Sequence, residues 1–126
     1  YQEAKKALSI GRAIGRAPVV HFDDLGIYRI IGKCADRSEL ESFVREKLGA
    51  LIDYDTERGT CLVETLRVYF ESASSTAAAA RALFVHGNTV KQRLSRISQI
   101  SGLDLSSTDD QFTAYLAVKI LDFLQA

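Results

Sequence analysis

Apolar residues recur every three or four positions along most of the chain, which is the spacing of amphipathic helices. This pattern predicts helices over residues 2–15, 23–32, 37–48, 59–72, 75–84 and 88–101, and a last helix from residue 107 or 108 to about residue 124. Residues 19–22, after the break at Pro18, are predicted to form a short extended segment. We therefore predict an all-α fold: a helical bundle that contains the later helices, preceded by a short helix and an extended segment.

The ends of several predicted helices carry capping residues. Asp36 and Ser75 are predicted N-caps, and Gly49 and Gly102 are predicted to end their helices. Residues 50–55 are then expected to form a loop or one helical turn. The break at residues 32–36 is the predicted boundary between residues 1–33 and a main domain over residues 34–126. Because the chain has no Met and begins inside an apparent helix, we expect a piece of a longer protein.

Residues 75–102 contain the pattern around which the main domain is organised. A short alanine-rich helix is followed by a break at residues 85–87, which includes Gly87, and by a second helix over residues 88–101 that ends at Gly102. The run Ala77 to Ala80 places small side chains on every face of the first helix, so a second helix backbone can approach closely. Together these features indicate a helix-turn-helix.

The second helix has two distinct faces. Its apolar stripe, predicted to face a core, consists of Val90, Leu94, Ile97 and Ser101. The opposite face carries Asn88, Gln92, Ser95, Arg96 and Gln99, with Lys91 on one flank and Thr89 and Arg93 towards the other. Amide side chains pair with adenine edges and arginine with guanine, while Lys, Arg, Ser and Thr contact phosphates. On this pattern alone, DNA recognition and an ordinary solvated surface helix both remain open.

A longer pattern resembles a known family. Leu83, Phe84, Val85, His86, Asn88, Thr89, Val90, Arg93, Leu94, Ile97, Ile100, Gly102 and Asp104 stand where the PucR/CdaR-type (sugar-diacid-type) bacterial transcriptional regulators have their C-terminal helix-turn-helix pattern. Upstream, Thr65-Leu66, Tyr69-Phe70 and residues 23–28, Asp-Asp-Leu-Gly-Ile-Tyr, also match the family. The resemblance covers most of residues 17–105. It implies a DNA-binding output domain, with the inducer sensed by an upstream domain that is absent from this chain. It also implies that residues 1–33, with their short helix, extended segment and linker helix, are the C-terminal remnant of the upstream regulatory module.

The helix-turn-helix pattern and the resemblance together predict a site for double-stranded DNA. We expect it to comprise Ser75, Thr76, His86, Gly87, Asn88, Thr89, Lys91, Gln92, Arg93, Ser95 and Arg96. Two positions depart from the family pattern. Gly87 stands where such regulators often have Arg, and Ala77 stands where a polar residue often begins the first helix. Each departure removes a possible contact to DNA.

The charge of the chain supports a local rather than a general attraction to DNA. The formal net charge is zero, which is unusual for an isolated DNA-binding domain. Residues 73–102, however, contain Arg81, Lys91, Arg93 and Arg96 and no acidic residue, whereas residues 36–72 and 103–126 are both net acidic. Because few phosphates would be neutralised, we expect modest non-specific affinity.

No enzyme motif accompanies this pattern. Cys34 and Cys61 lack the spacing of a zinc site and are expected to be ordinary thiols of a cytoplasmic protein. Asp53, Asp55 and Glu57 alternate like calcium ligands but lack the glycine and final glutamate of an EF-hand loop. We expect no catalytic residue, no metal site and no cofactor. No membrane-spanning stretch or signal peptide is visible.

The last predicted helix leaves the assembly open. It carries apolar side chains over a broad face, namely Phe112, Tyr115, Leu116, Ile120, Phe123 and Leu124, and adds Val118 and Leu121 on the opposite side. This helix either pairs with a second chain in a homodimer or lies clamped between its own neighbours. The rival to DNA binding is a helical dimerisation or protein-interaction module. In either case Leu66, Leu83, Leu94 and Ile97 are predicted to be almost fully buried.

Overall fold

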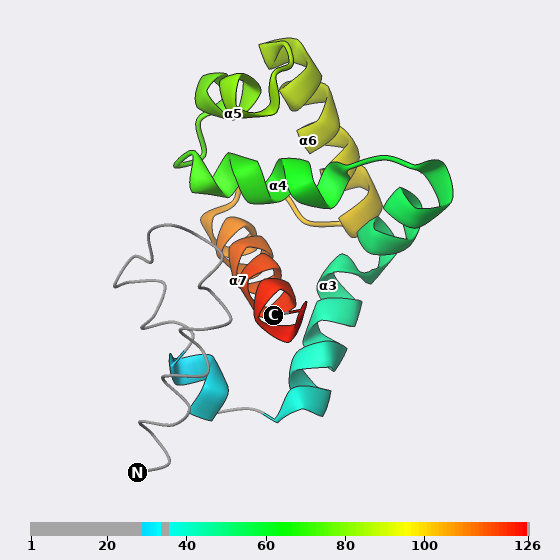
Figure 1. Cartoon of the computed structure of the whole chain (residues 1–126), viewed down its shortest axis with the longest axis vertical. Coiled ribbons are helices and arrows are strands. Elements are labelled where there is room, and N and C mark those ends of the chain that lie inside the picture. Colours follow the sequence, from blue (N-terminus) through cyan, green and yellow to red (C-terminus); the bar gives the residue numbers. More distant parts are fainter. Residues whose placement is uncertain (1–28, 34–35, 126) are drawn as a thin grey trace. The chain divides into compact units, whose positions relative to one another are not determined.

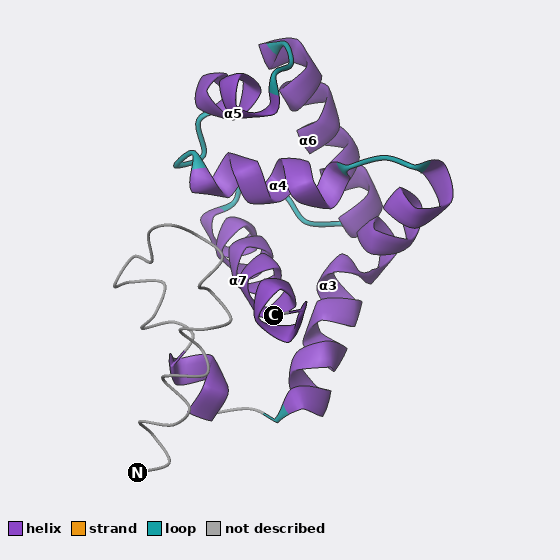
Figure 2. Ribbon diagram, in the orientation of Figure 1, coloured by secondary structure: helices purple, strands orange, loops and turns teal. Residues whose placement is uncertain are grey.

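The computed structural model describes residues 29–33 and 36–125, and these residues form helices joined by turns, with no strand among them (Figures 1 and 2). The elements are α3 (Arg37–Arg58), α4 (Leu62–Glu71), α5 (Thr76–Leu83), α6 (Gly87–Ser101) and α7 (Thr108–Gln125). Residues 29–33 are helical as well. The all-α prediction is therefore confirmed. The first predicted helix, the extended segment and most of the 23–32 helix lie outside the described residues.

Two compact units divide the chain, one made of Tyr1–Val44 with Lys119–Ala126 and one made of Arg45–Val118. In the first, Asp36 caps α3 as predicted, since its carboxylate accepts a hydrogen bond from the Glu39 amide at 2.8 Å. The Arg37 guanidinium donates to the Leu124 carbonyl oxygen at 3.0 Å. The buried apolar side chains of this first unit are Ile31, Leu40, Val44, Ile120 and Leu121.

The predicted end of the 37–48 helix at Gly49 is wrong, because α3 continues to Arg58. Gly49 lies inside the helix, and a Cβ there would come within 2.7 Å of the Arg45 side chain. Arg45 passes over this glycine and donates to the Asp53 carboxylate at 3.2 Å. The buried Leu48 and Leu51 extend the apolar stripe past the glycine. Packing therefore outweighs the low helix propensity of one glycine.

The start of α4 also differs from the prediction, which placed it at residue 59. Gly59 has a left-handed backbone (φ 66°) and ends α3 instead. The Asp55 carboxylate then accepts hydrogen bonds from the Thr60 hydroxyl and from the amides of Leu62 and Val63 at 2.8 and 2.9 Å. A residue expected in a loop is thus the cap of α4.

The helices α4, α5 and α6 pack against one another in pairs (Figure 1). Ala79, Ala80 and Val90 form a buried cluster, and Val68, Tyr69, Leu83, Val85 and Leu94 pack around it. Leu66 and Ile97 are fully buried, as predicted. The prediction for Leu83 and Leu94 is wrong, since both are only half-buried. They lie at the edge of a cluster built on small alanine side chains, which leave part of each leucine uncovered.

The connection from α6 to α7 is held by local hydrogen bonds. Gly102 has a left-handed backbone (φ 77°) and donates to the Ser98 carbonyl at 2.9 Å, which confirms it as the C-cap of α6. The Ser106 hydroxyl and amide donate to the Asp104 carboxylate and lower the pKa of that group. Ser107 accepts a long hydrogen bond, 3.5 Å, from the Asp110 amide at the start of α7.

Within the second unit, α7 buries its small residues rather than its aromatic ones. Ala114, Ala117 and Val118 are buried, whereas Phe112 is 63% exposed. The predicted broad apolar face is thus only partly used, and the side assigned to Val118 and Leu121 is the more deeply buried one. In the part of the chain that the structure describes, no helix is both long and apolar enough to cross a membrane.

Candidate nucleic-acid interface

A tight turn joins α5 to α6 (Figure 1). Ser75 caps α5, because its hydroxyl oxygen accepts a hydrogen bond from the Ala78 amide at 3.1 Å. Phe84 ends α5 with a left-handed backbone (φ 58°, ψ 41°), and its amide and that of Val85 donate to the Arg81 and Ala80 carbonyls. His86 then takes the extended N-cap position of α6. The predicted helix–break–helix is confirmed, with α6 beginning one residue earlier than expected.

The outer face of α6 is the polar face predicted from the sequence. All its side chains are exposed: Asn88, Lys91, Gln92, Ser95, Arg96 and Gln99. Among the described residues, none of these six side chains forms a hydrogen bond or an ion pair. Nothing within the fold therefore occupies their donors and acceptors.

Two predicted site residues lie elsewhere on α6. Thr89 and Arg93 are half-buried and lie one helical turn apart on the second flank. The Arg93 guanidinium donates to the Thr65 hydroxyl oxygen at 3.2 Å, and the buried Thr65 hydroxyl donates to the Cys61 carbonyl at 2.9 Å. Arg93 thus helps to hold α6 against α4. Sequence reasoning missed this contact, because the two residues are 28 positions apart and only the fold brings them together.

The N-terminal end of α6 is open. The amides of Thr89 and Val90 donate to the His86 carbonyl, so the amides of Gly87 and Asn88 are left without an acceptor in the described residues. His86 is exposed, and its side chain forms no capping hydrogen bond. Free backbone amides at a helix N-terminus favour an anion such as phosphate.

The remaining predicted residues sit at the start of α5. Ser75 and Thr76 are half-buried. The Ser75 hydroxyl already accepts a hydrogen bond from the helix, but its own proton can still be donated. The structure thus brings five of the predicted residues, Asn88, Lys91, Gln92, Ser95 and Arg96, together with Gln99 on the exposed outer face of α6, with His86 at its N-terminal end.

Comparison with known proteins identifies this arrangement. Residues 62–120 match the family described as the PucR C-terminal helix-turn-helix domain. Residues 62–120 form a PucR-type helix-turn-helix domain. The match begins at the first residue of α4 and includes α5 and α6, so the whole helix-turn-helix lies within the matched residues.

Three of the similar proteins are named as transcriptional activators or regulators. The chain is 32% identical over 122 residues to the DNA-binding transcriptional activator AdeR of Bacillus subtilis, which is 95% of this chain and 29% of that protein. It is 28% identical over 123 residues to the proline-responsive transcriptional activator PutR of the same organism (96% and 30%). The carbohydrate diacid regulator of Escherichia coli is 41% identical over 59 residues (47% and 15%). The chain spans less than a third of the length of these relatives.

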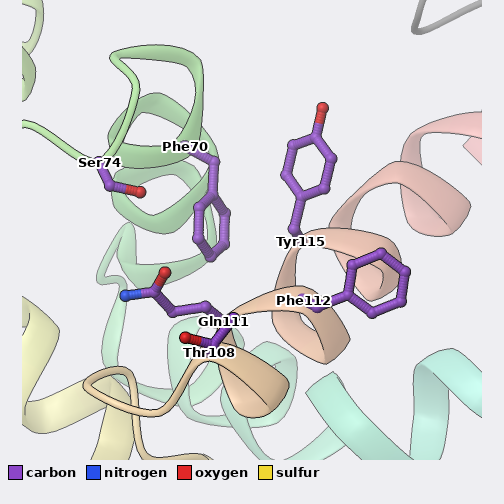
Figure 3. A pocket seen from close by; sticks show the side chains of 6 residues that line it. All are labelled: Phe70, Ser74, Thr108, Gln111, Phe112 and Tyr115. Carbon is purple, nitrogen blue, oxygen red and sulfur yellow. The ribbon is translucent and has the colours of Figure 1, made fainter.

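A hollow in the PucR-type domain lies away from the outer face of α6. It is a hollow of about 340 Å³ lined by Phe70, Ser74, Thr108, Gln111, Phe112 and Tyr115. Figure 3 shows the Phe70 and Tyr115 rings next to each other and the Phe112 ring pointing away from Phe70; the first two meet edge to face, with ring centres 5.5 Å apart. Its lining includes no charged side chain, and the Gln111 amide already donates to the Leu105 carbonyl.

Metal-ligating side chains do not gather in the part of the chain that the structure describes. Over residues 29–33 and 36–125, no group of three or more His, Cys, Asp or Glu residues could hold a metal ion. Asp55, weighed above as a calcium ligand, directs both carboxylate oxygens to the start of α4. Cys61 is a free, exposed thiol.

Proposed function

We propose that this chain is the sequence-specific DNA-binding output domain of a bacterial transcriptional regulator, with α6 as the recognition helix in the major groove. The observation that carries the proposal is the outer face of α6: one helix face of amide, hydroxyl and basic side chains, all exposed and all free of partners within the described residues. A helix-turn-helix presents this face of its second helix to DNA.

Base contacts are assigned to the outermost residues. Asn88 and Gln92 are one helical turn apart and exposed, so their amides can reach the edges of neighbouring bases. Arg96 lies one turn further on and reaches either a base at the groove edge or a phosphate. Ser95 lies next to Arg96 on the same exposed face and can contact a base or a phosphate.

Phosphate contacts are assigned to the flanks and to the helix ends. Lys91 is exposed on one flank of α6, where a phosphate strand would run. His86 and the free amides of Gly87 and Asn88 favour a phosphate at the start of α6. Ser75 and Thr76 do the same at the start of α5. We also assign Thr89 and Arg93 to phosphate contacts on the second flank. Arg93 would use the N–H groups that do not bond Thr65.

The wider setting is also a proposal. We propose a cytoplasmic regulator in which an upstream domain senses a small-molecule inducer. A homodimer of this protein would read two half-sites about one DNA turn, roughly 34 Å, apart. Support comes from the relatives, which are about three times as long as this chain and include activators named as DNA-binding or proline-responsive. We propose no catalytic role for any residue.

A helical interaction module remains the alternative, and it rests on α7. Phe112 is 63% exposed and lines the hollow together with Phe70 and Tyr115, so this surface has apolar area to offer another chain. The outer face of α6 favours DNA instead, because residues 73–102 contain basic residues and no acidic one.

Selection from a random pool of double-stranded DNA tests the function directly. The bound pool should converge on one motif, and the affinity for that motif should fall as salt rises, because bound phosphates release counterions. The interaction module predicts no enrichment of any sequence, no salt-dependent binding, and self-association in sedimentation.

A further inference from the structure

Phe84 has an unusual backbone and an unusual exposure for a phenylalanine. It lies in the turn of the helix-turn-helix with φ 58° and ψ 41°, and it is 94% exposed. Glycine or asparagine is preferred at such a left-handed position after a helix, because a Cβ is strained there. Helix capping alone would therefore be served better by glycine.

Packing does not account for Phe84 either. The neighbouring Val85 is the turn residue that packs against the buried cluster of Ala79, Ala80 and Val90. Three large hydrophobic residues are exposed in the described part of the chain, and Phe84 is more exposed than Ile30 (64%) or Phe112 (63%). The ring thus contributes little to the folded domain by itself.

The position of Phe84 connects it to the outer face of α6. From residue 84 to residue 88, exposed and half-buried residues alternate, so Phe84, His86 and Asn88 are the exposed members of one short run. This run leads into the N-terminal end of α6. The surrounding residues 73–102 carry four basic side chains and no acidic one. Their positive charge favours negatively charged DNA as the partner over a protein surface with few acidic residues.

We propose that the Phe84 ring reads a thymine by packing against its C5-methyl group, next to the bases contacted by Asn88. The thymine methyl is the apolar group that B-DNA presents in the major groove, and phenylalanine is one of the side chains that contacts it. This inference rests on the proposed function. It adds an apolar contact to a face that otherwise offers hydrogen bonds and charge.

The test uses the 126-residue chain and the duplex that it selects from a random pool. Phe84→Gly removes the ring and suits the left-handed backbone, so the domain should fold with equal or higher melting temperature. Ile30→Ala is the control, since it removes an exposed apolar side chain far from the turn in sequence. The duplex is compared with copies in which each thymine in turn is replaced by uracil, which lacks only the methyl group.

We expect Phe84→Gly to weaken binding to the selected duplex by about three- to fivefold, the factor that corresponds to one apolar methyl contact. Uracil at one position should weaken binding of the parent by a similar factor and leave the Phe84→Gly variant unaffected. Ile30→Ala should bind as the parent does.

Three results would overturn the inference while leaving the proposed function intact. Phe84→Gly could bind with unchanged affinity and unchanged sequence preference. It could weaken binding to all sequences alike, with no uracil position that distinguishes it from the parent. It could alter only the sedimentation of the chain, which would make the ring a protein contact. If the parent selects no sequence at all, the proposed function fails and this inference fails with it.

Discussion

The first amides of α4 and of α6 are in opposite states. At α4, the amides of Leu62 and Val63 donate to the carboxylate of Asp55, which also accepts the Thr60 hydroxyl. At α6, the corresponding amides of Gly87 and Asn88 have no acceptor among the described residues, and the His86 side chain does not cap the helix. One helix start is closed by the fold, and the other is left open.

The difference separates residues that stabilise the domain from residues that are available to a partner. Polar groups near the start of α4 are tied to the fold, including the buried Thr65, which bonds both Cys61 and Arg93. Polar groups along the outer face of α6 are exposed and free. Substitutions at the two helices should therefore change different quantities, namely the free energy of unfolding at α4 and the affinity for DNA at α6.

The largest expected effect concerns the apolar sides of these helices. Leu66 of α4 is fully buried, so Leu66→Ala should lower the free energy of unfolding by about 2–5 kcal/mol. Leu94 of α6 is half-buried, and Leu94→Ala should cost clearly less. Urea denaturation followed by circular dichroism measures both. Equal losses would mean that α6 is as deeply integrated into the core as α4.

The outer face of α6 should show two kinds of DNA effect. Gln92→Ala should weaken binding to the selected duplex by about 1–3 kcal/mol and relax preference at one position, because a base contact is lost. Lys91→Ala should weaken all sequences alike and reduce the salt slope by about one unit, because a phosphate contact is lost. Fluorescence anisotropy over a salt series distinguishes them. Identical behaviour of the two variants would argue against separate base and phosphate contacts.

Substitutions at the starts of α4 and α6 test whether the two helix starts differ in function. Asp55→Ala should lower the free energy of unfolding by about 1–2 kcal/mol, because two helix amides lose their acceptor, and the folded variant should bind DNA as the parent does. His86→Ala should leave the free energy of unfolding unchanged and weaken DNA binding. Thermal melts and DNA titrations of both variants give the four values required. The contrast between the two helix starts fails if His86→Ala destabilises the domain as much as Asp55→Ala.

The smallest expected effect is a gain at Gly87. Nothing lies within 4 Å of a Cβ built at this position, and its backbone suits any residue, so Gly87→Arg should fit without strain. The added cation should raise affinity for DNA of any sequence and steepen the salt slope by about one unit. Gly87→Ala is the control, because it adds the Cβ without the charge. A salt slope that stays the same would place the start of α6 away from phosphate.

The elements around the turn could be predicted from the sequence, because their signals are local. The cap at Ser75, the C-cap at Gly102 and the two faces of α6 follow from residue types and from a period of 3.6, and the structure confirms all three. The match with the PucR-type family confirms the helix-turn-helix. The DNA contacts of individual residues stay predictions.

The misplaced features depend on contacts over longer distances. Gly49 looked like a helix end, but the side chain of Arg45 crosses it to reach Asp53. Asp55 looked like a loop residue, but it caps a helix that begins seven positions later. The exposure of Phe84 was not anticipated either, because an apolar residue in a matched motif is expected to pack.

The central claim is that the outer face of α6 reads DNA sequence, and one variant tests it most directly. Asn88, Gln92 and Arg96 are replaced together by alanine, and binding to the duplex selected by the parent is titrated beside Arg58→Ala, which removes an exposed positive charge from α3. We predict that the triple variant keeps the melting temperature of the parent and loses its sequence preference, while Arg58→Ala binds the duplex as the parent does. A triple variant that binds the selected duplex as tightly and as selectively as the parent would contradict the account.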